Sequence, residues 1–387
     1  MGENAFRYDA SHITVLEWPQ IVRKRPGMYV GTTTQRGLHT MVFQVIGRSV
    51  DEVLDGRASR VTVTLRADGG VCVADDGGGV PMAGSGSGDG IALEDLLTCD
   101  YVWSRADGRR RVLVSSIGLG PFVANALSTR MTAEVESGGA REVREYARGV
   151  ATEPAVAGGP ATGDGTTITF WPDPEIFPDP HCAFDELADR LREVALLNRR
   201  LDLTLTDERP ADGPLSLRLH FPGGAREFVA FLDAGAGGPA QPEIFGFEVE
   251  DERSAGTVEV ALRWRDDPEE RIHGFANSRA TKAGTHLLGL RDGLAAALTA
   301  YARQQGLLPE TAPDLSPEAI GVGLTAVVSV KLDTPEFEGA TRGVLGGTQV
   351  RSAVAGAVRD HLGAWLRADP ARAAAVVRRV LRGGEGR

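Results

Sequence analysis

The sequence has 387 residues, of which 25% are charged and 42% are hydrophobic. This length favours two domains, each large enough to bury its own core, and the composition is that of an ordinary globular protein. The net charge of -11 excludes a chain whose whole surface binds nucleic acid, although a local basic patch is compatible with it.

The cysteines and the N-terminal residues indicate a cytoplasmic protein. Cys72, Cys99 and Cys182 are widely spaced and form no C-x-x-C pair, which is typical of reduced thiols and predicts no metal site. Residues 1–19 contain no continuous apolar stretch of the kind found in secretory signals. No run reaches the roughly twenty apolar residues that a membrane span requires. We therefore expect no metal ligands and no association with a membrane.

The strongest helical pattern lies in residues 37–56, after a polar N-terminal arm that carries Tyr8. Apolar residues recur there at three- and four-residue steps, which is the period of a helix with one buried face. Gly56 follows the last apolar residue and suits the end of a helix. Gln44 and Arg48 stand four residues apart, so their side chains are expected on one face of this helix, one turn from each other.

A β-hairpin is predicted directly after this helix. Residues 60–65 alternate between polar and apolar side chains, and residues 71–74 form the returning strand after a glycine-containing turn. The second strand leads into Asp75 and a glycine-rich stretch that contains Gly77 and Gly79. A carboxylate followed by glycines is a weak signal by itself, because many turns have the same composition.

The rest of the chain is a mixture of helices and strands. Gly118 and Gly120 open a second helical pattern, and the backbone N–H groups of such a glycine-rich helix start suit phosphates. Beyond residue 222 strands and helices alternate, which favours a β-α-β layer. The segments expected there are strands at residues 257–264, 271–276 and 324–332, helices at residues 285–304 and from 348 on, and helix-like residues 364–382.

These motifs, in this order, resemble those of the GHKL ATPases, and in particular the N-terminal half of the gyrase B family. The similar segments cover nearly the whole chain, from YDASHITVLEWPQIVRKRPGMYVG through GTTITFWPDPEIF and GTHLLGL to GLTAVVSVK. The resemblance implies an α+β fold, in which a GHKL (Bergerat) ATPase domain with a helix-covered mixed sheet precedes a β-α-β transducer domain. We place the first domain, with its N-terminal arm, at residues 1–221 and the transducer domain at residues 222–387.

The resemblance also implies roles for individual residues. Asp75 matches a carboxylate that accepts a hydrogen bond from the adenine amino group. Thr166 matches a residue that assists it through water, while Gly77 and Gly79 let the backbone approach the base. The other matches are Gly118 and Gly120 at the phosphates, Arg144 at the pocket mouth, Tyr8 on an arm that reaches the nucleotide of a second subunit, and Arg342 in place of a transducer Lys that reaches the γ-phosphate.

Two positions depart from the family pattern in a way that bears on catalysis. Gln44 stands where the family has a Glu that acts as general base, and an amide cannot accept a proton from water at neutral pH. Arg48 stands where the family has an Asn that ligates magnesium, and a guanidinium cannot ligate a cation. The resemblance implies ATP or ADP as the ligand, whereas these two departures make a role for magnesium doubtful.

Three functions remain open from the sequence. The first is a gyrase-B-like protein that binds nucleotide but is impaired in hydrolysis, and that acts as a homodimer through its N-terminal region or as a heterodimer with a gyrase-B-type subunit. The second is a scaffold in which Arg48 fills the pocket and pairs with Asp75 or Asp76. The third is an active, ATP-hydrolysing fragment of a type II topoisomerase subunit. The sequence ends at residue 387, so we expect it to lack the gyrase B domain that assists DNA cleavage, and contact with DNA stays open.

Overall fold

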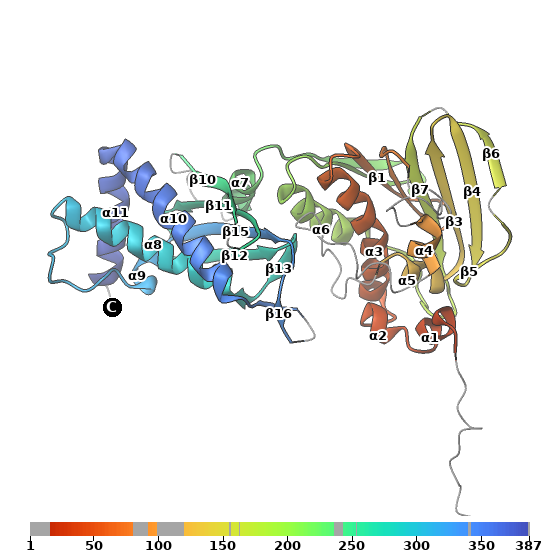
Figure 1. The fold of residues 1–387 in the computed structure, drawn as a ribbon, viewed down its shortest axis with the longest axis horizontal. Helices are drawn as coiled ribbons and strands as arrows, with labels where there is room; N and C mark the ends of the chain where they lie inside the picture. Colours follow the sequence, from red (N-terminus) through yellow and green to blue (C-terminus); the bar gives the residue numbers. More distant parts are fainter. Residues whose placement is uncertain are drawn as a thin grey trace, which may run out of the picture.

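The structure is a computed structural model, and it describes residues 16–79, 92–98, 120–154, 156–161, 163–235, 243–252, 254–339 and 342–385. In this part of the chain, two assemblies of helices and strands lie one after the other along the long axis of the molecule (Figure 1). Each assembly has a mixed or antiparallel sheet with helices packed against it, so the expectation of an α+β fold is confirmed.

The first assembly is built on a mixed sheet in which the described strands have the order β5-β4-β3-β7-β2-β1-β8-β9, with β6 paired to β4. Its strands pair antiparallel, except β1 and β8, which are parallel. The strands are β1 (Arg60–Leu65), β2 (Val71–Asp75), β3 (Ser128–Ser137), β4 (Ala140–Ala147), β5 (Val150–Ala151), β6 (Val156–Pro160), β7 (Gly165–Pro172), β8 (Asp202–Asp207) and β9 (Leu215–Leu219). The predicted hairpin is therefore confirmed as β1 and β2.

Helices α3 and α6 pack against this sheet (Figure 1). The helix predicted at residues 37–56 is α3, which begins two residues earlier and buries Leu38, Val42 and Ile46 completely. These side chains join the apolar faces of the strands in one core cluster, which explains why the apolar period is so regular. The helices of this assembly are α1 (Trp18–Lys24), α2 (Gly27–Val30), α3 (Gln35–Leu54), α4 (Leu93–Thr98), α5 (Phe122–Ala126) and α6 (Phe184–Leu196).

The second assembly is built on a sheet with the order β10-β11-β15-β12-β13 and a small sheet with the order β14-β17-β16. Strands β12 and β15 are parallel neighbours, and helix α8 lies between them in the sequence, so the predicted β-α-β arrangement is confirmed. The strands are β10 (Phe245–Asp251), β11 (Gly256–Trp264), β12 (Arg271–Ala276), β13 (Arg279–Thr281), β14 (Ala283–Gly284), β15 (Leu324–Leu332), β16 (Phe337–Glu338) and β17 (Val344–Leu345).

Helices cover both faces of the five-stranded sheet. Because side chains alternate along a strand, Val258 and Val260 of β11 join the core with α8 and α10, while Ala261 joins a different core with α7. The helices are α7 (Ala225–Gly235), α8 (Thr285–Gln304), α9 (Pro317–Gly321), α10 (Thr348–Ala368) and α11 (Pro370–Glu385). None of the helices in the described ranges is long and apolar enough to cross a membrane.

The chain between α10 and α11 differs from the expectation of one helix-like stretch at residues 364–382. Helix α10 ends at Ala368, and α11 begins at Pro370. Asp369 between them has an extended backbone, with φ at -141° and ψ at 93°. The ring of a proline disfavours the helical conformation of the residue before it, which accounts for the break.

A third core cluster joins the two assemblies. Leu196 and Leu197 at the end of α6 pack with Phe228 of α7 and Phe275 of β12. Polar contacts accompany it: the Asn198 Nδ2 donates to the Ser278 Oγ at 2.9 Å, and the Arg199 Nη2 lies 2.6 Å from the Glu259 carboxylate, which is itself buried. The two assemblies are thus connected by a continuous apolar and polar interface.

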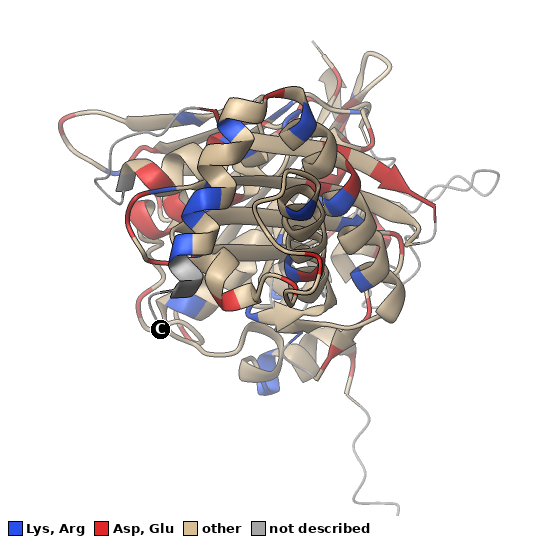
Figure 2. Cartoon of the chain, turned by 90° about the vertical axis from the view of Figure 1, so that its left-hand side faces the viewer, with Lys and Arg blue, Asp and Glu red and all other residues tan. Residues whose placement is uncertain are grey.

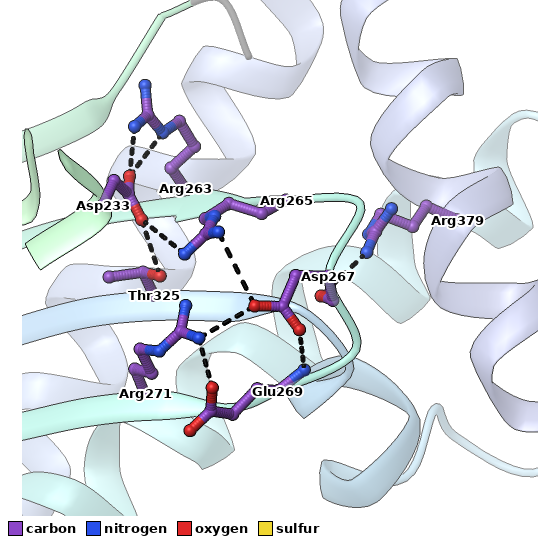
Figure 3. A network of polar contacts seen from close by, with 8 residues as sticks. All are labelled: Asp233, Arg263, Arg265, Asp267, Glu269, Arg271, Thr325 and Arg379. Atoms are coloured by element: carbon purple, nitrogen blue, oxygen red, sulfur yellow. Dashed lines mark hydrogen bonds and ion pairs between the residues drawn. The ribbon is translucent and has the colours of Figure 1, made fainter. Parts of the chain in front are cut away.

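A partly buried ion network lies at the C-terminal end of β11, around Asp233 of α7 (Figure 3). The Asp233 carboxylate, on α7, accepts a hydrogen bond from the Arg263 Nε at 2.7 Å and from the Thr325 Oγ1 at 3.0 Å. The Arg265 guanidinium approaches the same carboxylate to 3.4 Å and Asp267 to 3.6 Å. Since a buried carboxylate is costly without counter-charges, the network fixes the end of α7 on strands β11 and β15.

Candidate functional site

Helix α3 buries the two polar side chains at which the sequence departs from the family pattern. Gln44 and Arg48 are each only 3% exposed, although they are among the most polar residue types. They lie one turn apart on the buried face, as their spacing predicts. Polar groups are tolerated in such positions only when they are hydrogen-bonded, so their partners define the chemistry of the site.

The guanidinium of Arg48 is held by two residues of the sheet. Its Nη1 donates to the Asp75 Oδ2 at 2.5 Å, and its Nη2 donates to the Thr166 Oγ1 at 3.0 Å. The same Nη2 lies 3.9 Å from the Glu52 carboxylate, one turn further along α3. Asp75 and Thr166 are cross-strand partners at the ends of β2 and β7, which is why one guanidinium reaches both.

The Asp75 carboxylate is enclosed on every side. Its side chain is 0% exposed, and its oxygens also accept hydrogen bonds from the Ser49 Oγ at 2.7 Å and the Gly77 backbone N–H at 3.3 Å. Burial raises the pKa of the Asp75 carboxyl, and the positive charge of Arg48 counteracts this rise. The two groups that the resemblance assigns to adenine, Asp75 and Thr166, are therefore occupied by Arg48.

Gln44 connects α3 to the start of α5. Its side-chain Oε1 accepts a hydrogen bond from the backbone N–H of Gly120 at 2.6 Å. Gly120 has a φ of 91°, a conformation that favours glycine. Gln44 thus has a structural role, and its amide offers no group that could take a proton from water. Gly118, the other glycine expected at the phosphates, lies outside the described residues.

Two of the glycines after Asp75, Gly77 and Gly79, are closely packed within the protein. A Cβ on Gly79 would lie 2.6 Å from the Glu136 carbonyl oxygen and 2.9 Å from the Ser137 Cβ, and the φ of Gly79 is 75°. A Cβ on Gly77 would lie 3.0 Å from the Asp75 Oδ1. These contacts with β3 and Asp75 give a structural reason for both glycines, and the role at an adenine ring stays a prediction.

Arg144 is held by a segment that the sequence did not link to it. Its Nη1 donates to the Glu94 Oε2 on α4 at 2.6 Å. The Asn125 Nδ2 of α5 donates to the Leu97 carbonyl of the same short helix at 2.9 Å. Helix α4 is thereby fixed to β4 and α5. Glu94 and Arg144 are 50 residues apart, so no local spacing could have indicated this pair.

Arg342, which was also predicted to lie at the nucleotide, makes no described contact with Arg48 or Asp75. Arg342 lies beside β13, where the Arg279 Nε donates to its carbonyl oxygen at 3.2 Å. Burial lowers the pKa of Arg279, and the charges of Arg342 and Arg190 add to this effect. Tyr8 lies outside the described residues, as do the two residues before Arg342.

The residues at this site do not fit a magnesium ion. The position that the resemblance gives to the metal-ligating Asn holds the Arg48 guanidinium, which has five donors and no acceptor. A divalent cation needs oxygen ligands, and the nearest carboxylate, Asp75, is already paired with that guanidinium.

Comparisons with known proteins agree with this architecture. A family model described as DNA gyrase B matches residues 224–387. The DNA gyrase B protein of Streptomyces coelicolor is 38% identical over 403 residues, and the alignment covers 100% of this chain and 59% of that protein. The chain therefore spans less than two thirds of the length of this relative.

Two solved structures are similar along nearly their whole length. The 43K ATPase domain of Thermus thermophilus gyrase B, determined in complex with an aminocoumarin, has a TM-score of 0.81 at 32% identity, with 95% of this chain and 94% of that chain covered. The ATP-binding domain of topoisomerase IV from Francisella tularensis, in complex with a small-molecule inhibitor, has a TM-score of 0.77 at 29% identity, with 96% and 98% covered. With the fold, the motif order and these similarities in agreement, the chain belongs to the DNA gyrase B family and corresponds to its GHKL ATPase region.

Proposed function

We propose that this gyrase-B-type chain does not hydrolyse ATP, and that Arg48 keeps its adenine site closed. The observation that carries the proposal is the contact of the Arg48 guanidinium with both Asp75, at 2.5 Å, and Thr166, at 3.0 Å. An adenine amino group would have to compete with a full positive charge for the same carboxylate. Charge-assisted hydrogen bonds are roughly twice as strong as neutral ones, so the internal partner has the advantage.

The loss of the base supports the first half of the proposal. Gln44 occupies the place of the general base, and its Oε1 already accepts the Gly120 N–H at 2.6 Å. A general base must be within reach of the attacking water and must have a pKa near the working pH. An amide can be within reach, but it has no pKa in that range. Both requirements for hydrolysis, the base and the metal ligand, are thus replaced on one helix.

The protein then acts by association instead of turnover. The fold of the ATPase region is retained in both assemblies, including the parallel β12 and β15 pair of the transducer type. A chain with this fold and no catalysis is suited to pair with a second copy, or with a gyrase-B-type subunit whose own site is intact. Any contact with DNA would come through that assembly.

One observation favours a second candidate, a protein that holds nucleotide without magnesium. Asp75, Gly77 and Thr166 are retained and lie together, so displacement of Arg48 would recreate an adenine site. The displaced guanidinium would then supply positive charge to the phosphates in place of the metal. In this candidate nucleotide binds but is not hydrolysed, and binding does not depend on magnesium.

The deciding experiment combines calorimetric titration with a phosphate-release assay. ADP and a non-hydrolysable ATP analogue are titrated, with and without magnesium, into the unmodified chain, Arg48→Asn, and the double variant Gln44→Glu/Arg48→Asn. We expect no binding and no phosphate release from the unmodified chain. Arg48→Asn should bind ADP, because Asp75 is freed, and the double variant should in addition release phosphate.

The control is Arg57→Asn, which removes an exposed arginine that pairs with Glu52 near the same helix. This variant should behave like the unmodified chain, and denaturant unfolding checks that each variant is folded. Magnesium-independent binding of ADP by the unmodified chain would support the second candidate and exclude the first. Phosphate release by the unmodified chain would exclude both.

A further inference from the structure

A hollow of about 240 Å³ lies between the C-terminal halves of α8 and α10. Figure 2 looks onto the end of the molecule that carries these helices, with Lys and Arg in blue. The volume is below the roughly 300–1,000 Å³ of most ligand pockets, so the hollow suits a small molecule. It is lined by Ala297, Ala300, Tyr301 and Gln304 of α8 and by Arg359, Asp360, Gly363 and Arg367 of α10.

The hollow lies C-terminal to a close approach of the two helices. The helices run in the same direction, and two glycines of α8 let them approach closely. A Cβ on Gly289 would lie 2.5 Å from the Arg351 carbonyl oxygen, and one on Gly293 would lie 2.7 Å from the Ala355 carbonyl oxygen. One turn beyond Gly293, small side chains continue on α8, but there is open space in front of them.

Gly363, on the α10 side of the hollow, differs from these two glycines. The nearest atom to a Cβ at this position is the Arg367 Nη1 at 3.3 Å, the end of a flexible side chain, and no backbone atom of another element is closer. Glycine lowers the stability of a helix interior relative to alanine, and here no close backbone contact requires it. Its effect is to keep space free in front of the Arg367 guanidinium.

Three polar side chains at the hollow are open to a ligand as well as to water, since Gln304 and Arg367 are exposed. In the described part of the chain, the side chains of Tyr301, Gln304 and Arg367 take part in no hydrogen bond or ion pair. Each of them can donate a hydrogen bond, and all three line the same hollow. On the rim, Arg359 pairs with Asp360 at 2.8 Å. Two arginines and one aspartate leave one net positive charge around the hollow.

We infer that this hollow binds a small organic monocarboxylate. The planar fork of Arg367 matches the two oxygens of a carboxylate, and Tyr301 and Gln304 are available as further donors. The methyl groups of Ala297 and Ala300 and the Tyr301 ring offer apolar surface to the body of the molecule. A single net positive charge favours a monoanion over a phosphate dianion. The site is distant in sequence from the Arg48 pair and does not depend on the function proposed for it.

The test is a titration of the full chain with acetate, benzoate and phenylacetate, followed by NMR or calorimetry. We expect saturable binding of at least the two aromatic acids, and binding of the neutral analogue benzamide that is at least tenfold weaker, because the charge-assisted hydrogen bond is lost. Arg367→Gln should weaken carboxylate binding about tenfold or more. Gly363→Ala should also weaken it, while raising the midpoint of thermal unfolding, which a purely structural glycine would not do.

Arg351→Gln is the matched control, because Arg351 is exposed on the same helix but pairs with Asp292 outside the hollow. This variant should bind the carboxylates as the unmodified chain does. Absence of carboxylate binding, equal binding of benzamide, or unchanged binding by Arg367→Gln would each overturn the inference.

Discussion

Arg48 carries a full charge on the buried face of α3, and its position there depends on Asp75. The side chains of the two residues are 4% and 0% exposed, so neither charge is solvated by water. A buried ion pair is often no more stable than a pair of apolar residues, but the loss of one partner is costly because the other charge stays buried. Replacement of either residue alone should therefore cost stability, even if the pair itself contributes little.

Asp75→Asn should destabilise the protein by about 3–5 kcal/mol, because it leaves the buried Arg48 with only the more distant Glu52 carboxylate, 3.9 Å away, as a counter-charge. The free energy of unfolding in urea measures this effect. Asp202→Asn is the control, since Asp202 pairs with the exposed Arg218 and surface pairs contribute little. If the two substitutions had the same small effect, the Arg48 and Asp75 pair would not be buried as described.

His286 should make the stability of the chain depend on pH. This residue is 0% exposed, its Nε2 lies 2.8 Å from the Thr281 Oγ1, and burial lowers its pKa from 6.5 to about 4. The unfolded chain therefore binds a proton between these values that the folded chain does not. The stability from this group is present above pH 6.5 and is lost toward pH 4, by up to roughly 3 kcal/mol.

Urea unfolding at about pH 7.5, 6 and 5 measures that dependence, and His286→Gln separates it from the carboxylates that titrate in the same range. The variant should show a flatter dependence of the unfolding free energy on pH. Parallel curves for the two proteins would mean that His286 titrates alike in the folded and unfolded chains.

In helices α8 and α10, replacement of glycine by alanine should have opposite effects on stability at two positions. Gly293→Ala should destabilise the chain by roughly 1–3 kcal/mol, because its Cβ would lie 2.7 Å from the Ala355 carbonyl oxygen and would push the helices apart. Helix propensity alone would predict the opposite effect, because alanine favours a helix more than glycine does. The urea midpoint measures it, and Gly363→Ala, which meets no backbone atom of another element, should shift the midpoint upward.

The elements that the sequence predicts best are those with local signals. The apolar period of α3, the alternation in β1 and the turn before β2 each involve residues close in the chain, and all were confirmed. The pairing of Arg48 with Asp75 was one of the open alternatives, because a buried cation needs a counter-charge. The pair of Glu94 with Arg144 was not predicted, since only the packing of α4 on β4 brings them together.

At the scale of the whole molecule, the core around Phe228 connects the two assemblies, and we expect it to make them one cooperative unit. Phe228 is 3% exposed and contacts Phe275 of β12 with ring centroids 5.4 Å apart. This interface also contains Leu196 and Leu197 at the end of α6. No local pattern predicted such a junction, because it depends on how residues from separate elements meet.

The unmodified chain should therefore unfold in a single calorimetric transition. Phe228→Ala should remove about 3–5 kcal/mol of packing from the junction and separate the transition into two. The matched control is Phe231→Ala on the same helix, because Phe231 is 49% exposed. A single transition for Phe228→Ala, unchanged in width, would show that the junction does not couple the two assemblies.

The internal pairing of Arg48 also has a consequence for how the cell could control such a protein. A subunit that closes and opens with nucleotide responds to the ratio of ATP to ADP. In this chain the Asp75 carboxylate already has a cationic partner, Arg48 of α3. Under the proposed function, the amount assembled would follow the abundance of the protein and of its partner, and would be independent of the energy state of the cell.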